Sequence, residues 1–253
     1  MPKFTVRNMT MHYEEAGEGP LMLILHGNTS SSAMHKREIE LFSQHFHVVA
    51  PDYIGVGKSD HLETWPDNWW EQNTEDVAGL IRSLDAGPAV LVGSSGGGIV
   101  SLGLTILYPE LVRAVIAESC PESYPQERLW SIVEDRKNPT RELIGFWIAA
   151  HGSEWKQVVE QDTAMMARLA ERGGHNFYDG RLSEIRCPVL LMGSFQDMTI
   201  PEIDKQLTSM ASQIPGSELY MVNRGAHPMM WSSPVQFFTM AQSFLIRVLG
   251  SES

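Results

Sequence analysis

The feature that most constrains the fold of this chain is a series of short, uninterrupted apolar runs separated by segments with helical spacing. Four such runs lie in the first half of the chain: "PLMLIL" at 20–25, "HVVAP" at 47–51, "AVLVG" at 89–93 and "VRAVIAE" at 112–118. Runs of this kind are typical of strands buried on both faces. Because strands that alternate with helices form crossover units, the pattern predicts an α/β fold with a mostly parallel sheet and helices on both faces.

The segments around these runs complete the predicted order of elements. "KFTV" and "TMHYEEAG" near the N-terminus predict a hairpin, and helices are expected over about 33–44, 69–84 and 96–108. In the second of these helices, apolar residues recur three and four positions apart, as they do in a helix that packs on one face. Strand and helix signals alternate again from "CPVLLMG" at 187–193, through "ELYMV" at 218–222, to a final helix after Ser232.

The alternation stops between residues 121 and 182, where only helix-like segments occur. We therefore predict a core domain made of residues 1–120 and 183–253, interrupted by an all-helical cap over 121–182 that acts as a lid. With 253 residues, of which 43% are hydrophobic, the chain is long enough for one large domain with such an insertion.

The net charge and the cysteines indicate which binding partners and which cellular compartment to expect. Lys and Arg number 19 against 31 Asp and Glu, a net charge of −12 that argues against binding to nucleic acid or an anionic membrane. No early apolar run approaches the roughly 20 residues that span a bilayer, so we expect a soluble, cytoplasmic protein. The cysteines, Cys120 and Cys187, are expected to be reduced and inert.

A serine framed by glycines follows one of the predicted strands. Residues 93–97, "GSSGG", match G-x-S-x-G between a strand and a helix, the context in which that motif presents a nucleophile at a tight turn. A phosphate cradle is the poorer interpretation, because no register gives G-x-G-x-x-G and no Gly-Lys-Ser/Thr follows. Taken alone, the motif is also compatible with a plain glycine-rich turn. The nucleophile hypothesis assigns the reactive hydroxyl to Ser95.

A serine nucleophile needs a base and an orienting carboxylate, and both types of residue follow predicted strands further along the chain. Asp197 lies in "GSFQDMTIP" and His227 in "NRGAHP". Open parallel sheets place their ligands at the carboxyl ends of strands, where both residues are predicted to lie. Each residue alone is equally explained by capping or surface roles. Their joint type, order and position favour a Ser-Asp-His triad.

The sequence also offers candidates for an oxyanion hole and a substrate pocket. The backbone amides of Gly96 and Asn28 are the predicted oxyanion donors, and His26 beside Asn28 is predicted to be a buried structural imidazole. Apolar side chains of the cap and of the triad loops suggest a hydrophobic acyl or aromatic site, although such residues are often simply core. The candidates are Phe146, Trp147, Met165, Met166, Met198 and Met229.

Together these motifs resemble the α/β-hydrolase superfamily over nearly the whole chain. The resemblance rests on "LHGN" at 25–28, "PDYIGVGKSD" at 51–60, "VGSSGGG" at 92–98, "CPVLLMGSFQD" at 187–197 and "GAHP" at 225–228. It implies an eight-stranded, mostly parallel sheet with a small helical cap after the sixth strand. It also implies Ser95, Asp197 and His227 as nucleophile, acid and base, with no metal or organic cofactor.

Within the superfamily the chain looks most like valacyclovir-hydrolase-like and enol-lactonase-like serine esterases, with departures that narrow the substrate. Gly96 stands where amino-acid ester hydrolases carry an acidic residue, so an α-amino ester is not expected. A serine nucleophile argues against the dehalogenation performed by relatives with aspartate. The loop from Gly193 to Asp197 is one residue longer than the family pattern, and some members supply the acid from the position of Glu118. We predict Asp197, because its spacing to Pro201 suits a turn into a helix.

The resulting expectation is a serine hydrolase that cleaves a small or medium carboxylic ester, thioester or lactone through an acyl-enzyme. The expected partner is a small-molecule substrate, an apolar acyl or aromatic ester. Two alternatives stay open: hydrolysis of a carbon-carbon bond in a diketone, and a non-catalytic ligand receptor on the same fold. The sequence makes no prediction of the oligomeric state.

Overall fold

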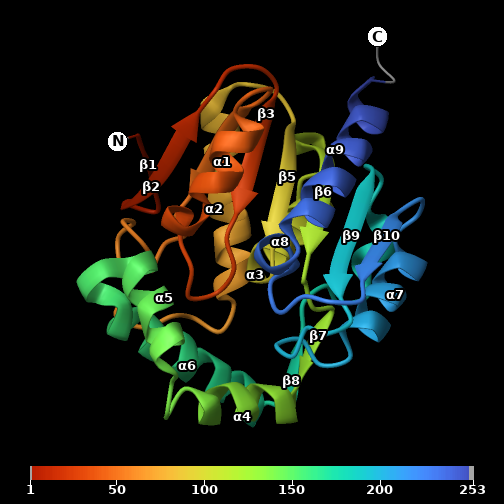
Figure 1. The fold of residues 1–253 in the computed structure, drawn as a ribbon. Helices are drawn as coiled ribbons and strands as arrows, with labels where there is room; N and C mark the ends of the chain where they lie inside the picture. The colour runs from red at the N-terminus through yellow and green to blue at the C-terminus, as the bar shows by residue number, and fades with distance from the viewer. Residues whose placement is uncertain (1, 251–253) are drawn as a thin grey trace.

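A computed structural model describes residues 2–250 and places a single large sheet at the centre of the molecule (Figure 1). The strand order is β1-β2-β4-β3-β5-β6-β9-β10; β2 is antiparallel to β1 and β4, and the remaining pairs are parallel. The strands are β1 (Lys3–Val6), β2 (Met9–Ala16), β3 (Leu21–Leu25), β4 (His47–Pro51), β5 (Ala89–Ser94), β6 (Val112–Glu118), β9 (Val189–Ser194) and β10 (Glu218–Val222). The predicted α/β-hydrolase fold with an eight-stranded, mostly parallel sheet is confirmed.

The parallel strands are buried on both faces because helices cover each side of the sheet. Leu23 of β3 contributes to a cluster shared with helices α2, α3 and α7, whereas its neighbour Ile24 points to the cluster formed with α1, α8 and α9. This alternation follows from the two-residue period of a strand. The helices of the core are α1 (Lys36–Phe42), α2 (Trp69–Leu84), α3 (Gly96–Leu107), α7 (Ile203–Gln213), α8 (Met229–Ser232) and α9 (Pro234–Gly250).

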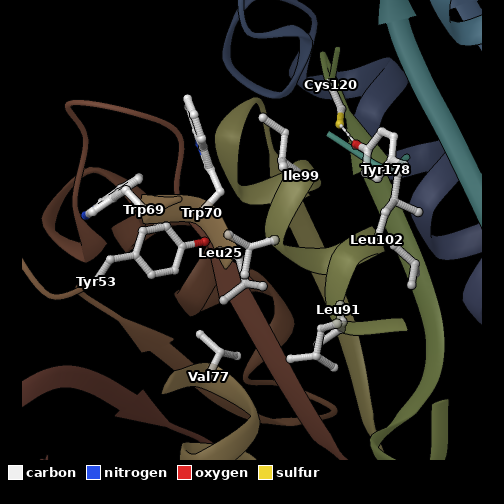
Figure 2. Close-up of a cluster of buried hydrophobic side chains, with 14 of the residues drawn as sticks. Leu25, Tyr53, Trp69, Trp70, Val77, Leu91, Ile99, Leu102, Cys120 and Tyr178 are labelled. Carbon is white, nitrogen blue, oxygen red and sulfur yellow. Dashed lines mark hydrogen bonds between the residues drawn. The ribbon is translucent and has the colours of Figure 1, made fainter. Parts of the chain in front are cut away.

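A buried aromatic group supports the end of β3 and the start of α2 (Figure 2). Trp69 stacks on Trp65 with ring centroids 4.1 Å apart and meets the ring of Tyr53 edge-on at 5.6 Å. All these side chains are almost fully buried. Close packing of large rings resists displacement, so this cluster holds the segment between β4 and α2 in place.

The segment between β6 and β9 carries the helices α4 (Gln126–Asp135), α5 (Arg141–His151) and α6 (Trp155–Glu171). Figure 1 shows these helices stretched across the carboxyl ends of the parallel strands. The prediction that this segment is entirely helical is wrong, since β7 (Ser123–Pro125) pairs antiparallel with β8 (Gly174–Asn176) at its base. Strands of three residues are too short for the alternation of apolar and polar residues to reveal them.

Within residues 2–250, none of the helices combines the length and apolar character that crossing a membrane requires.

Candidate active site

Ser95 lies at the sharp turn between β5 and α3. Its backbone has φ +54° and ψ −118°, and its amide donates a 2.9 Å hydrogen bond to the carbonyl of Glu118 on the neighbouring strand. The glycines around it are required by close packing. A Cβ on Gly97 would lie 1.9 Å from the carbonyl oxygen of Leu25. The turn therefore holds a non-glycine residue in a strained conformation, a feature that clusters at functional sites.

His227 and Asp197 meet above the carboxyl ends of β9 and β10. The Nδ1 atom of His227 lies 2.7 Å from Oδ2 of Asp197, whose other oxygen accepts hydrogen bonds from the amides of Thr199 (2.8 Å) and Ile200 (3.1 Å). The carboxylate is buried and held at both oxygens. This arrangement orients the imidazole with Nδ1–H toward Asp197 and leaves Nε2 available as a base.

Glu118, the other candidate for the acid, makes its hydrogen bonds to residues other than His227. Its side chain is fully buried at the end of β6, where one oxygen accepts the hydroxyl of Ser94 and the other accepts the amide of Met230 at 3.4 Å. Burial raises the pKa of this carboxyl group, and the hydroxyl of Ser94 opposes that shift. Glu118 thus links β5, the strand before Ser95, to the segment after His227, whereas Asp197 contacts the imidazole.

Asn28 and Gly96 bring two backbone amides next to Ser95. A Cβ on Gly96 would lie 3.2 Å from the amide nitrogen of Asn28 and 2.1 Å from its Oδ1, so the two residues are packed against each other. The amide of Asn28 donates to no group among residues 2–250, and that of Gly96 is in the first turn of α3, where amides lack helical acceptors. The tight contact also explains why a side chain is absent at position 96.

Polar contacts on both sides fix the side chain of Asn28. Its Oδ1 accepts a 3.0 Å hydrogen bond from Nε1 of Trp70 on α2, and its Nδ2 donates at 2.8 Å to Asp162 on α6. Asp162 is fully buried and forms an ion pair with Arg136 at the end of α4. The loop that carries the predicted oxyanion donor is therefore held by the core and the cap together.

Further hydrogen bonds join the same loop to α5. Nε1 of Trp147 donates to the Thr29 hydroxyl at 3.2 Å, Nε2 of His151 lies 2.9 Å from the Thr29 carbonyl, and the hydroxyl of Ser31 donates to the carbonyl of Ala150 at 2.7 Å. The predicted lid is thus anchored to the loop after β3. Its α5 and α6 helices position that loop as well as cover it.

His26 is fully buried beneath this loop. Its Nδ1 donates to the carbonyl of Gly27 at 2.8 Å, and its Nε2 accepts the amide of Tyr53 at 3.3 Å. Burial lowers the pKa of His26 to about 3, so the ring is neutral near pH 7. These contacts support the structural role predicted for His26.

Asn28, Ser95 and His227 line one cavity of about 460 Å³, whereas Gly96 and Asp197 lie behind its wall. The cap contributes Phe146, Trp147 and Met166, as predicted for the substrate pocket, together with Leu143 and Ile132. The structure does not bring three of the predicted pocket residues to this wall. Met165 and Met229 are buried in the hydrophobic core, and the side chain of Met198 is 87% exposed.

The reason for these corrections is the direction of each side chain. Met165 and Met166 are neighbours on α6, so they point about 100° apart, and only Met166 faces the cavity. Five further residues that line the cavity were not predicted from the sequence: Tyr124, Arg128, Asp135, Arg136 and Trp231. For Arg128 and Arg136 the sequence does hold a signal. Arg128, Ile132 and Arg136 follow one another at intervals of four residues, which places them on the same face of a helix.

Cys120 makes no hydrogen bond to a histidine or a carboxylate among residues 2–250. Its sulfur lies 3.2 Å from the hydroxyl of Tyr178, a hydrogen bond drawn as a dashed line in Figure 2. Burial raises the pKa of the thiol to about 12. A thiol with this pKa is protonated near neutral pH and is a poor nucleophile. No group of His, Cys, Asp or Glu side chains suited to hold a metal ion occurs in residues 2–250.

Comparison with known proteins places this geometry in a family. Residues 22–240 match the model of the alpha/beta hydrolase family. A 2-(acetamidomethylene)succinate hydrolase of Mesorhizobium japonicum is 41% identical over 114 residues, which cover 44% of this chain and 40% of that protein. An (E)-2-((N-methylformamido)methylene)succinate hydrolase of Acinetobacter baylyi is 24% identical, with 94% of this chain and 95% of the relative covered.

Solved structures agree with this assignment. The crystal structure of E-2-(acetamidomethylene)succinate hydrolase superposes with a TM-score of 0.77 at 25% identity, covering 96% of this chain and 98% of that one. The chain belongs to the alpha/beta hydrolase family. Its family and relatives support hydrolase activity on a small molecule.

Proposed function

We propose that this protein is a serine hydrolase that cleaves a small or medium carboxylic ester, thioester or lactone through an acyl-enzyme on Ser95. The observation that carries the proposal is the 2.7 Å contact of His227 with the buried Asp197, together with the cavity that His227 and Ser95 both line. A base that is oriented by a buried carboxylate and shares a cavity with a serine on a strained turn is the arrangement that activates a hydroxyl nucleophile.

In the proposed reaction, Oγ of Ser95 attacks the substrate carbonyl while Nε2 of His227 accepts its proton. The protonated imidazole then donates that proton to the leaving alcohol, thiol or lactone oxygen. Water, deprotonated by His227, attacks the acyl-enzyme and breaks the bond between the acyl carbon and Oγ of Ser95. The imidazolium then returns the proton to Oγ, which regenerates Ser95 as the acid leaves. Asp197 stays ionised and stabilises the imidazolium through its contact with Nδ1. This chemistry requires no metal or organic cofactor.

The backbone amides of Asn28 and Gly96 are the proposed donors to the oxyanion. Their packing against each other and their free N–H groups support this role. Donors that are held in place before reaction stabilise the developing charge without reorganisation. The apolar wall formed by Phe146, Trp147 and Met166 supports an acyl group with aliphatic or aromatic character.

The first prediction tests the nucleophile with p-nitrophenyl butyrate. We expect the wild-type protein to release p-nitrophenol in steady turnover and Ser95→Ala to lower kcat by about 10⁴-fold or more with the fold retained. Cys120→Ala is the matched control, because its buried thiol is outside the proposed mechanism, and it should keep most of the activity. Ester hydrolysis near the wild-type rate in Ser95→Ala would remove Ser95 from the mechanism.

The same assay separates the alternatives. A ligand receptor would bind esters without steady release of p-nitrophenol. A carbon-carbon bond hydrolase would turn over a vinylogous diketone with a kcat/KM far above that of any ester, thioester or lactone in a matched panel. Either result would replace the proposed reaction.

A further inference from the structure

Helix α4 contributes charged side chains to the cavity wall, whereas α5 contributes apolar ones. Arg128, Ile132, Asp135 and Arg136 all line the cavity from successive turns of α4 and its C-terminal end. The proposed ester hydrolysis uses none of them. Burying guanidinium groups is costly unless they are paired, so their presence in the wall of a substrate cavity needs a reason.

Arg136 already has a partner. It forms an ion pair with the fully buried carboxylate of Asp162 and donates to the hydroxyl of Thr163 at 3.1 Å. Its charge is therefore compensated inside the protein. Its role is explained by the link from Asp162 to Asn28, and a substrate anion would have to compete with a buried carboxylate for it.

Arg128 is not compensated in this way. Its side chain is 16% exposed, yet Nε is buried and has no hydrogen-bond acceptor in residues 2–250. Its terminal nitrogen donates to the hydroxyl of Ser131 at 3.2 Å and lies 3.9 Å from Asp135, a carboxylate whose side chain is 70% exposed. A contact at that distance with a solvated partner is weak. The guanidinium therefore brings a positive charge to the cavity wall, and its buried Nε–H has no acceptor among residues 2–250.

Tyr124 lines the same cavity. It lies on β7, two residues before Gln126 begins α4, and its hydroxyl donates to no group in the described chain. The residue is 6% exposed and close enough to Arg128 to feel its charge: burial raises the pKa of the phenol, and the guanidinium opposes this. A guanidinium and a protonated phenol are both hydrogen-bond donors suited to a carboxylate.

We propose that Arg128, assisted by Tyr124, binds a carboxylate at the far end of the acyl group, so that the substrates are esters, thioesters or lactones of dicarboxylic acids. This inference rests on the proposed function and names its substrate class. The apolar wall from α5 contacts the carbon chain, and Arg128 supplies the charge that selects an anion. The net charge of −12 repels anions from the molecule, so the preference must arise locally.

The test compares two series of p-nitrophenyl esters with six to eight carbons in the acyl chain, ending in a carboxylate or in its neutral carboxamide isostere. Assays run at about 0.15 M salt, which screens the charge of the surface. We expect wild type to favour the carboxylate series at least tenfold in kcat/KM, chiefly through KM. Arg128→Gln should abolish that preference while changing kcat/KM for the carboxamides less than threefold.

Two further variants control for charge and fold. Arg141→Gln removes the same charge from an exposed position at the start of α5 that does not line the cavity, and it should keep the full preference. Arg128→Lys should keep part of it, because an ammonium retains the charge without the planar donors. Equal kcat/KM for both series in wild type, or an unchanged preference in Arg128→Gln, would overturn the proposal.

A binding measurement separates this inference from the proposed reaction. Calorimetry with Ser95→Ala should show the intact carboxylate ester binding at least tenfold more tightly than the carboxamide, and adding Arg128→Gln should remove the difference. If Ser95-dependent turnover is absent but this difference is present, the reaction is wrong and the carboxylate site stands. If turnover depends on Ser95 but binding does not distinguish the two ligands, the carboxylate site is wrong and the reaction stands.

Discussion

At the scale of single residues, two buried carboxyl groups near His227 have different hydrogen-bond partners. Asp197 contacts Nδ1 at 2.7 Å and is held by the amides of Thr199 and Ile200. Glu118 instead accepts the hydroxyl of Ser94 and the amide of Met230. The longer loop after Gly193 therefore does not prevent the aspartate from reaching the imidazole.

This difference leads to a ranking of two charge-removing variants. We expect Asp197→Asn to lower kcat by about 10⁴-fold, because an amide in place of the carboxylate favours the wrong imidazole tautomer. Glu118→Gln should lower kcat less than tenfold, since its amide oxygen still accepts the hydroxyl of Ser94. Steady-state kinetics with p-nitrophenyl butyrate measure both, and circular dichroism confirms that each variant folds. A larger loss in Glu118→Gln would move the acid to that residue.

At the scale of elements, the cap and the loop after β3 form one unit. Helix α5 contacts this loop through Trp147 and His151, and α6 contacts it through Asp162. The side chain of Asn28 is held between Trp70 on α2 and Asp162 on α6. The position of the predicted oxyanion donor thus depends on the packing of cap helices that are distant in the sequence.

Replacing Asp162 tests this dependence. Asp162→Ala leaves the guanidinium of Arg136 without its carboxylate and Nδ2 of Asn28 without its acceptor, so we expect a loss of about 3–5 kcal/mol in unfolding free energy. We also expect kcat to fall at least tenfold while KM changes little, because the oxyanion donor loses its alignment. Urea unfolding and ester kinetics give the two readouts.

Two other variants distinguish a loss of the position of Asn28 from a general loss of stability. Asp162→Asn keeps an oxygen that accepts from Asn28, and it should restore most of kcat while remaining less stable than wild type. Glu160→Ala, on the exposed side of α6, should match wild type in both measurements. An unchanged kcat in Asp162→Ala would show that the loop holds its position without α6.

At the scale of the whole molecule, neutral imidazoles are buried where the cap meets the core. Burial lowers the pKa of His26 to about 3 and also lowers that of His151. His26 has a folded pKa below its unfolded value of 6.5, so the unfolded chain binds more protons between those values. Its contribution to stability is complete above pH 6.5 and is lost as the pH falls toward 3.

The pH dependence of unfolding tests this burial. Between pH 7.5 and pH 5, we expect His26 alone to lower the unfolding free energy by about 2 kcal/mol, with a smaller loss of the same sign from His151. Urea unfolding at both pH values should show a smaller pH-dependent loss in His26→Asn than in wild type. The exposed His45→Asn variant should retain the wild-type dependence. Equal losses in all three proteins would contradict the buried, neutral state of His26.

Local patterns predicted the fold well because the apolar pattern of a strand or a helix is visible within a short stretch of sequence. The helix expected over 69–84 matches α2, and the apolar runs became the central strands of the sheet. The same patterns put Asp197 and His227 at strand ends, and the structure brings these two residues into contact. The pair β7 and β8 was missed, since three residues are too few to show a period.

What the sequence by itself determined was the order of the elements, the α/β-hydrolase fold and the strand-end positions of the predicted triad. Only the tertiary structure decided which carboxylate contacts the imidazole of His227 and which methionine lines the cavity. It also decided that Arg128 has only a long contact with an exposed carboxylate, whereas Arg136 pairs with the buried Asp162. The physical reason is the separation along the chain of the residues that interact. Periodicity and turn chemistry act between neighbours along the chain, whereas these contacts join residues brought together by packing of the cap against the core, and that packing sets the direction of each side chain.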